Sequence, residues 1–255
     1  MNATLTQQNV ISNNLANLST VGFKQSRSLN VEFPSHLFAR LHDQRLKTFE
    51  GSLELRPPVG VTGGGVIPEE VATDYTQGSR FETNNKLDFA LTGSGTYFTV
   101  QGPEGQTLFT RNGNFNLDAD GRVVTQDGYA VMGHNGDVII DGSEVSVDVE
   151  GNIQVDGKAL DSLLVAKVSD EAKLEKVGHS LFKASQGQVV DYAPDPEDVL
   201  VQQGFLEQSN VNPVREMTQM IEAARLYELN ARVITMYDSA MERTATEVGD
   251  TKNYT

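Results

Sequence analysis

The stretch 214–248, VREMTQMIEAARLYELNARVITMYDSAMERTATEV, decides how the rest of the chain can be arranged. Apolar residues recur along it at steps of three and four, with one polar member at Asp238. This 3.5-residue period is typical of a coiled-coil seam, which packs against another helix. We predict a helix over 213–249, capped by Asn212 and followed by a tail over 250–255. Its assembly seam is predicted to contain Met217, Met220, Ala224, Tyr227, Ala231 and Ile234.

The opposite end of the chain offers the partner that such a seam requires. Residues 2–18 are predicted to form a helix in which Ile11, Leu15 and Leu18 follow the same spacing. This helix is short and rich in asparagine, so it is weak in isolation. It therefore either covers the surface of the core or becomes stable only inside an assembly. Gly22 is predicted to end the segment in a left-handed conformation.

Composition excludes several classes of protein. The chain carries 35 acidic and 20 basic residues, and a net charge of −15 argues against a nucleic-acid partner. The absence of cysteine excludes disulfides, thiolate metal sites and a cysteine nucleophile. No apolar run reaches about 18 residues, so we expect no direct membrane insertion. The first 20 residues lack the pattern of a cleaved signal peptide.

The middle of the chain predicts a β-rich domain over 76–201. Short strands alternate there with Asp-Gly and Asn-Gly turns, which favours an antiparallel meander or a barrel-like sheet. Residues 25–75 are predicted to be an extended connector, with one short helix after Pro34 formed by Phe33, Leu37, Phe38 and Leu41. Gly63–Gly65 is predicted to be flexible, since no phosphate-loop lysine follows it. Residues 202–212 form an extended return segment, and the fold class is α+β.

No arrangement of residues in the sequence predicts catalysis. Asp118, Asp120 and Gly121 resemble a calcium loop only faintly and are better explained as a hairpin turn. Ser94 lies in Gly-Ser-Gly, which is not a nucleophile elbow. The histidines form no metal-ligand pair; they are His36, His42, His134 and His179. We therefore predict a protein that is not an enzyme, with no catalytic residue, metal or cofactor. A soluble β-rich binding protein or cell-wall hydrolase is the alternative of another class.

Both ends of the chain carry long motifs. The run 11–24, ISNNLANLSTVGFK, and the run 203–212, QGFLEQSNVN, together resemble the two terminal signatures of the flagellar rod and hook protein family. A third run, from Arg111-Asn112-Gly113-Asn114-Phe115 to Gly128-Tyr129, also resembles that family. The signature residues are Asn13, Asn14, Asn17, Gly22, Phe23, Lys24, Gly204, Phe205, Glu207, Ser209 and Asn210.

The resemblance implies an axial structural subunit of the bacterial flagellar basal body. Helices 1–24 and 213–249 would form a coiled-coil-like inner layer, stacking with those of neighbouring subunits to transmit motor torque. The implied partners are further copies of the chain, other rod and hook subunits, and the flagellar export apparatus. A distal rod position is favoured. The alternatives are the proximal rod and the hook, although a hook subunit would need larger outer domains.

Overall fold

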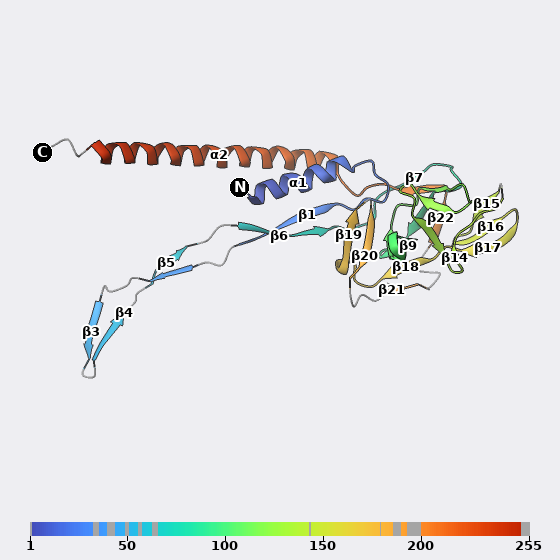
Figure 1. The fold of residues 1–255 in the computed structure, drawn as a ribbon, viewed down its shortest axis with the longest axis horizontal. Helices are drawn as coiled ribbons and strands as arrows, with labels where there is room; N and C mark the ends of the chain where they lie inside the picture. Colours follow the sequence, from blue (N-terminus) through green and yellow to red (C-terminus); the bar gives the residue numbers. More distant parts are fainter. Residues whose placement is uncertain are drawn as a thin grey trace. The chain divides into compact units, whose positions relative to one another are not determined.

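The computed structural model describes residues 2–32, 36–39, 44–48, 51–55, 58–62, 66–142, 144–178, 180–185, 190–192 and 200–250. The chain divides into two compact units. One comprises Met1–Val10, Arg27–Ala72 and Gln219–Thr255, and the other comprises Ile11–Ser26 and Thr73–Thr218. The architecture is mostly antiparallel β-sheet with a helix at each end of the chain, which confirms the α+β class in its main features (Figure 1).

The terminal helices are α1 (Asn2–Ala16) and α2 (Pro213–Asp250). The predicted cap of α2 is confirmed, because the side-chain oxygen of Asn212 accepts the backbone N–H groups of Val214 and Arg215 at 3.1 and 3.2 Å. The chain leaves α1 through a turn in which Gly22 has a φ of +66°, as predicted. Leu18 lies in this turn rather than in the helix, and α2 runs through Gly249 to Asp250.

The described residues of 26–73 form three pairs of strands. They are β1 (Ser26–Glu32) with β6 (Val66–Thr73), β2 (His36–Ala39) with β5 (Pro58–Thr62), and β3 (Gln44–Thr48) with β4 (Gly51–Leu55) (Figure 1). The predicted helix after Pro34 is wrong, because Leu37 and Phe38 lie in β2 opposite Val61 and Gly60. Its apolar pattern spanned too few residues to distinguish a helix from a strand. Phe33, Leu41, His42, Gly63–Gly65 and His179 lie outside the described residues.

The β-rich part continues from residue 80 to residue 207. Its elements are β7 (Arg80–Glu82), β8 (Phe89–Thr92), β9 (Thr96–Gln101), the 3₁₀ turn η1 (Pro103–Gly105), β10 (Thr107–Thr110), β11 (Phe115–Leu117), β12 (Val123–Thr125), β13 (Ala130–Gly133), β14 (Gly136–Asp137), β15 (Val145–Val147), β16 (Asn152–Val155), β17 (Lys158–Ser162), β18 (Val165–Val168), the 3₁₀ turn η2 (Glu171–Lys173), β19 (Leu174–Gly178), β20 (Leu181–Ala184), β21 (Val190–Asp191), β22 (Leu200–Gln203) and β23 (Phe205–Glu207).

Strand β9 organises the main sheet. It pairs with β10, with β13 and with β18, so the strand order departs from a simple meander. Its residues Thr96 to Val100 are all buried, as expected for a strand covered on both faces. The predicted barrel-like closure is not found, because the main sheet of the described residues runs open from β11 to β19. The predicted turn at Asp118–Gly121 is confirmed, joining the antiparallel pair β11 and β12.

Two apolar clusters form the core around this sheet. The larger one includes Phe115, whose ring contacts those of Phe89 and Phe98 with centroids 6.0 and 5.2 Å apart. The smaller one contains Tyr97, Phe109 and Phe182. Strand β22 returns antiparallel to β8, and β23 returns antiparallel to β7. The segment leading to the C-terminal helix is therefore held against the segment that enters the β-rich part.

Candidate assembly joint

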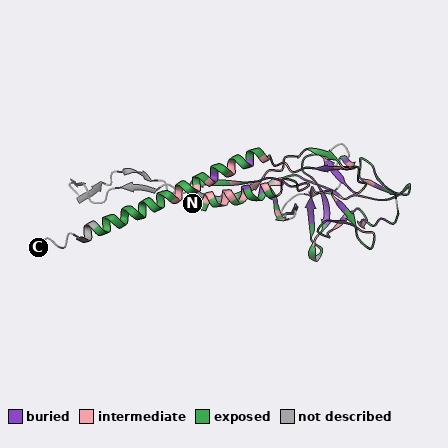
Figure 2. Ribbon diagram, turned by 90° about the horizontal axis from the view of Figure 1, so that it is seen from above, coloured by how far each residue is buried: buried purple, intermediate pink, exposed green. Residues whose placement is uncertain are grey.

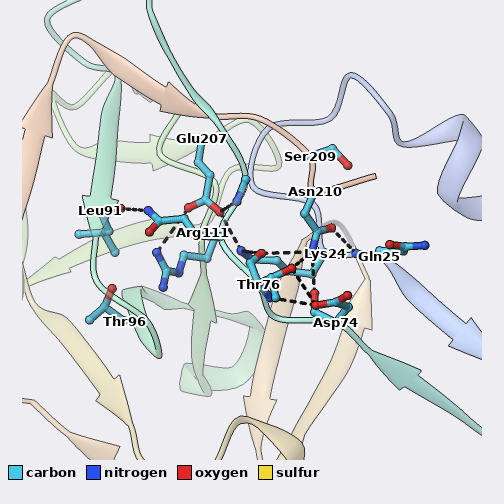
Figure 3. A network of polar contacts seen from close by, with 12 residues as sticks. Lys24, Gln25, Asp74, Thr76, Leu91, Thr96, Arg111, Glu207, Ser209 and Asn210 are labelled. Carbon is cyan, nitrogen blue, oxygen red and sulfur yellow. Dashed lines mark hydrogen bonds and ion pairs between the residues drawn. The ribbon is translucent and has the colours of Figure 1, made fainter. Parts of the chain in front are cut away.

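Glu207, at the end of β23, is the centre of a buried polar network (Figure 3). One carboxylate oxygen accepts hydrogen bonds from the ammonium group of Lys24 at 2.7 Å and from the backbone N–H of Gly78 at 3.0 Å. The other lies 3.4 Å from a guanidinium nitrogen of Arg111. The side chains of Lys24, Arg111 and Glu207 are no more than 1% exposed. These contacts join the N-terminal signature, the β-rich part and the C-terminal signature at one point.

Asn210 forms the next layer of the network. Its side-chain oxygen accepts the backbone N–H of Gln25 at 2.7 Å. Its amide nitrogen donates to the backbone oxygens of Asp74 and Thr76 at 2.8 and 3.1 Å (Figure 3). Lys24 donates to the same Thr76 oxygen at 2.9 Å. One asparagine thus fixes the separation of three segments that are remote in the sequence.

Glu216, in the first part of α2, connects that helix to the end of α1. Its two carboxylate oxygens accept the side-chain amides of Gln25 at 2.7 Å and Asn14 at 3.0 Å. Asn14 in turn exchanges hydrogen bonds with the backbone of Ser26, at 2.8 and 2.9 Å. Asn14 and Glu216 are both about 1% exposed, so these bonds are made without competition from water. We call Asn14, Lys24, Gln25, Arg111, Glu207, Asn210 and Glu216 the joint.

A further acid, Glu171, lies beside the joint and is linked to it through Tyr97. Arg111 lies 5.2 Å from the centroid of the Tyr97 ring, and the Tyr97 hydroxyl donates to Glu171 at 2.8 Å. Burial raises the pKa of the Tyr97 hydroxyl well above its ordinary value. Burial also lowers the pKa of Lys24, although the contact with Glu207 opposes that shift. Two buried cations therefore depend on neighbouring carboxylates, and the loss of one carboxylate would leave a charge uncompensated.

Gly22 lets the N-terminal segment approach Arg111. A Cβ atom at Gly22 would lie 2.5 Å from the backbone carbon of Arg111, and the backbone adopts a left-handed conformation there. We expect Gly22→Ala to lower the free energy of unfolding by about 2–4 kcal/mol, through left-handed strain and overpacking. Gly128→Ala is the matched control, because Gly128 also has a positive φ but no atom within 4 Å of its added Cβ. Chemical denaturation of both variants measures the difference, and equal losses would contradict the close approach.

Lys176 contacts the joint from strand β19. Its ammonium group donates to the backbone oxygen of Lys24 at 3.0 Å and lies 3.8 Å from the centroid of the Phe23 ring. Burial lowers the pKa of Lys176 from 10.5 to about 8. The unfolded chain therefore holds a proton on this lysine between about pH 8 and pH 10.5, where the folded chain has lost it. Raising the pH through that window favours the folded state.

A pH series tests this linkage. The melting temperature of the wild type, relative to Lys176→Met, is expected to rise between pH 7.5 and pH 10. Other titrating groups are common to both proteins and cancel in the comparison. A constant difference across that range would show that Lys176 keeps its proton when folded.

The structure brings six signature residues together in or against the joint: Asn14, Gly22, Phe23, Lys24, Glu207 and Asn210. The other five lie nearby but have local contacts. The amide of Asn17 donates to the backbone oxygen of Asn13 at 2.8 Å. Gly204 has a φ of +81°, Phe205 is half-buried in β23, and the Ser209 hydroxyl accepts the backbone N–H of Val211 at 3.3 Å.

The predicted seam residues differ in exposure. Ile11 is buried, and Leu15, Leu18, Met220, Ala224, Tyr227 and Ala231 are half-buried. Met217 and Ile234 are 52% and 47% exposed. Figure 2 shows the distal part of α2 in the colour of exposed residues.

Sequence reasoning gave no role to four residues of this region: Gln25, Arg111, Lys176 and Glu216. Glu216 stands in the first turn of α2, where the helix dipole favours negative charge whether or not the side chain is buried. Arg111 begins the third motif, and its position before Asn112-Gly113 gives no sign of burial. The available signal was indirect, since Lys24 and Glu207 each stand next to apolar residues at the two ends of the chain.

The chemistry of the joint is that of structural support. Among the described residues, no group of three or more histidine or carboxylate side chains is placed to hold a metal ion. His36 is in β2 and His134 follows β13. Neither helix, over the part that the structure describes, is long and apolar enough to cross a membrane.

Comparisons with known proteins agree at three places along the chain. Residues 1–24 match the flagella basal body rod protein family, residues 90–158 match the flagellar hook protein FlgE/F/G D1 domain, and residues 202–247 match the flagellar basal body rod FlgEFG protein C-terminal family. The flagellar basal-body rod protein FlgG of Agrobacterium fabrum is 36% identical, covering 93% of this chain and 92% of the relative.

Other relatives extend over similar lengths. The rod protein FlgG of Caulobacter vibrioides is 35% identical, covering 92% of this chain and 91% of the relative. The rod protein FlgF of the same organism is 31% identical, covering 88% of this chain and 84% of the relative. The N-terminal family match includes Asn14 and Lys24 of the joint and ends just before Gln25, and the C-terminal match includes Glu207, Asn210 and Glu216.

Proposed function

This chain belongs to the flagellar basal-body rod protein family and is a structural subunit of the bacterial rod, and we propose that it polymerises in the distal rod and transmits motor torque towards the hook. The FlgG relatives of Agrobacterium fabrum and Caulobacter vibrioides are 36% and 35% identical and the FlgF relative is 31% identical, which supports the distal position. The proximal rod is the alternative. The chain is proposed to act without catalysis, cofactor or metal.

The joint is the observation that best supports the proposed transmission of torque. Ion pairs and hydrogen bonds between Lys24 and Glu207, and between Asn14 and Glu216, cross between the two ends of the chain. Arg111 and Gly78 attach Glu207 to the β-rich part. Torque applied to the helices would thus reach the β-rich part through a buried network of ion pairs and hydrogen bonds. Such a network resists shear because each broken bond would leave a buried polar group without a partner.

Each segment of the chain is proposed to have its own role in the rod. Segments 1–24 and 213–249 form a coiled-coil-like inner layer, residues 25–75 connect the layers, residues 76–201 form the outer layer, and residues 202–212 return to the helix. The half-buried row of Met220, Ala224, Tyr227 and Ala231 supports a helix that packs along one side. The chain is proposed to reach the basal body through the flagellar secretion apparatus, without cleavage of a signal peptide. Other rod and hook subunits are its expected neighbours.

Complementation tests this function. Cells lacking this chain are expected to be non-motile and to yield basal bodies with a shortened rod and no hook. The wild-type chain should restore swimming, full-length rods and its own band in purified basal bodies. Full rods in cells without the chain would overturn the proposal.

A further inference from the structure

A cavity of about 310 Å³ lies beside the joint, within the unit that comprises Ile11–Ser26 and Thr73–Thr218. Its wall is formed by the last part of α1 and the turn after it, the segment after β10, the turn between β12 and β13, and the chain from β19 to the start of β20. The residues that line it include Phe23, Asn112, Lys176 and Ser180. Ligand cavities range over about 300–1,000 Å³, so an occupant of this one would be small.

Lys176 brings a positive charge to this cavity that no described acid balances. Its ammonium group donates to the backbone oxygen of Lys24 at 3.0 Å and to the Ser26 hydroxyl at 3.4 Å, and both acceptors are neutral. An ammonium group has three donors, so one remains for a ligand. Lys24 and Arg111, by contrast, share the carboxylate of Glu207. Burial alone lowers the pKa of Lys176, without the opposing contribution that a carboxylate makes at Lys24, and a pKa of about 8 leaves the group mainly charged at pH 7.

Ser180 adds a buried donor without a partner. The residue is 3% exposed, and its hydroxyl forms no hydrogen bond with any residue that the structure describes. Its backbone has a φ of +58°, a left-handed conformation that is unfavourable for a residue with a Cβ atom. Buried hydroxyls are nearly always hydrogen-bonded, and backbone strain is concentrated at ligand sites. A strained and unpaired hydroxyl in the wall of a cavity therefore indicates an occupant that accepts its hydrogen bond.

Asn112 is held beside Ser180 on the same wall. The Thr110 hydroxyl donates to the backbone oxygen of Ser180 at 3.0 Å and accepts the backbone N–H of Asn112 at 3.0 Å. The side-chain oxygen of Asn112 accepts the backbone N–H of Asn114 at 3.0 Å, which leaves both N–H donors of its amide without a described partner. The cavity thus offers an ammonium group, a hydroxyl and an amide as donors.

We propose that this cavity binds a small oxyanion, with Lys176 as its counter-ion and Ser180 and Asn112 as its hydrogen-bond donors. The oxygens of phosphates and carboxylates accept hydrogen bonds, and lysine is a common ligand of phosphate. Asp127 also lines the cavity, but it is exposed, so water screens its charge more than that of the half-buried lysine. A bound anion would neutralise Lys176 where this residue contacts the N-terminal segment, and would strengthen the joint. The inference goes beyond the proposed function and does not rest on it.

Titration of the purified full-length chain with sodium phosphate tests the site. Isothermal titration calorimetry at pH 7, in a phosphate-free buffer of constant ionic strength, is expected to show saturable binding. Lys176→Met removes the counter-ion. Asn112→Asp replaces the amide donors with a carboxylate and keeps the oxygen that accepts the N–H of Asn114. Each change is expected to weaken phosphate binding by about tenfold or more, and circular dichroism checks that both variants are folded.

Lys158→Met is the matched control, because Lys158 is an exposed lysine of β17 outside the cavity. It should bind phosphate as tightly as the wild type. Binding to Lys176→Met or Asn112→Asp that equals binding to the wild type would place the anion elsewhere and overturn the proposal.

Sodium acetate in a parallel titration distinguishes the two sources of an oxyanion. Tighter binding of phosphate would identify a free phosphate as the ligand, and tighter binding of acetate would identify a carboxylate. Either result supports the site if Lys176→Met weakens that binding. The absence of saturable binding of both anions would overturn the proposal, because the cavity would then hold water alone. These measurements use the free chain, so their outcome does not depend on rod assembly.

Discussion

Glu207→Gln is expected to lower the free energy of unfolding by about 3–5 kcal/mol, the largest effect of any single substitution in the joint. The change removes the carboxylate that Lys24 and Arg111 share, and both cations remain buried. A neutral amide can accept a hydrogen bond but cannot balance charge. Chemical denaturation followed by circular dichroism measures the loss, and rod assembly at the growth temperature should fall with it.

The control for Glu207 is Glu144→Gln. Glu144 lies 3.9 Å from Lys86, and its side chain is 79% exposed. Exposed pairs of this kind contribute about 0–1 kcal/mol. Adding Lys24→Met to Glu207→Gln should cost less than the two single changes together, because one of the unpaired cations is then removed. A Glu207→Gln protein as stable as Glu144→Gln would mean that the joint does not hold the termini.

Ile234→Asp is expected to abolish rod assembly and motility while leaving the melting transition of the free chain unchanged. Ile234 is already 47% exposed, so an aspartate there meets water in the monomer. In the assembled rod the same position is predicted to be buried, and an unpaired charge costs several kcal/mol on burial. Each subunit repeats the contact, so the penalty recurs along the whole rod.

Glu242→Asp is a conservative change at an exposed position of the same helix. Cells that carry it should swim and assemble rods like the wild type. Normal rods from Ile234→Asp would show that the predicted seam of α2 is not an assembly surface. A collapsed melting transition would show that the residue belongs to the core of the free chain. Purified basal bodies and thermal denaturation separate these outcomes.

The sequence pattern was enough to predict those elements that depend only on interactions between residues close together in the chain. The 3.5-residue period predicted α2, Asn212 predicted its cap, and the Asp-Gly turn at Asp120-Gly121 predicted the hairpin of β11 and β12. These features depend on hydrogen bonds or side-chain rows within a few turns of the chain. The short helix at Leu37 and Phe38 failed because strand pairing with residues about twenty positions away decides that conformation.

The joint could not be predicted because its partners are far apart in the sequence. Lys24 and Glu207 are separated by 183 residues, and Asn14 and Glu216 by 202. Nothing in their local sequence states that the charges are buried or paired. The resemblance of both termini to one family indicated that these residues matter, but the reason for it lies in the packing. The central position of β9 is similar, since pairing with β13 and β18 depends on the order of strands in space.

A cryo-electron microscopy map of the isolated basal body tests the central claim most directly. We predict that density for this chain lies in the rod and that Lys24, Arg111 and Glu207 remain in contact in each subunit. The distal half of α2 should be covered by neighbouring subunits. A rod in which this chain is present but the Lys24–Glu207 and Asn14–Glu216 contacts are broken would contradict the claim that the joint carries load between the helices and the β-rich part.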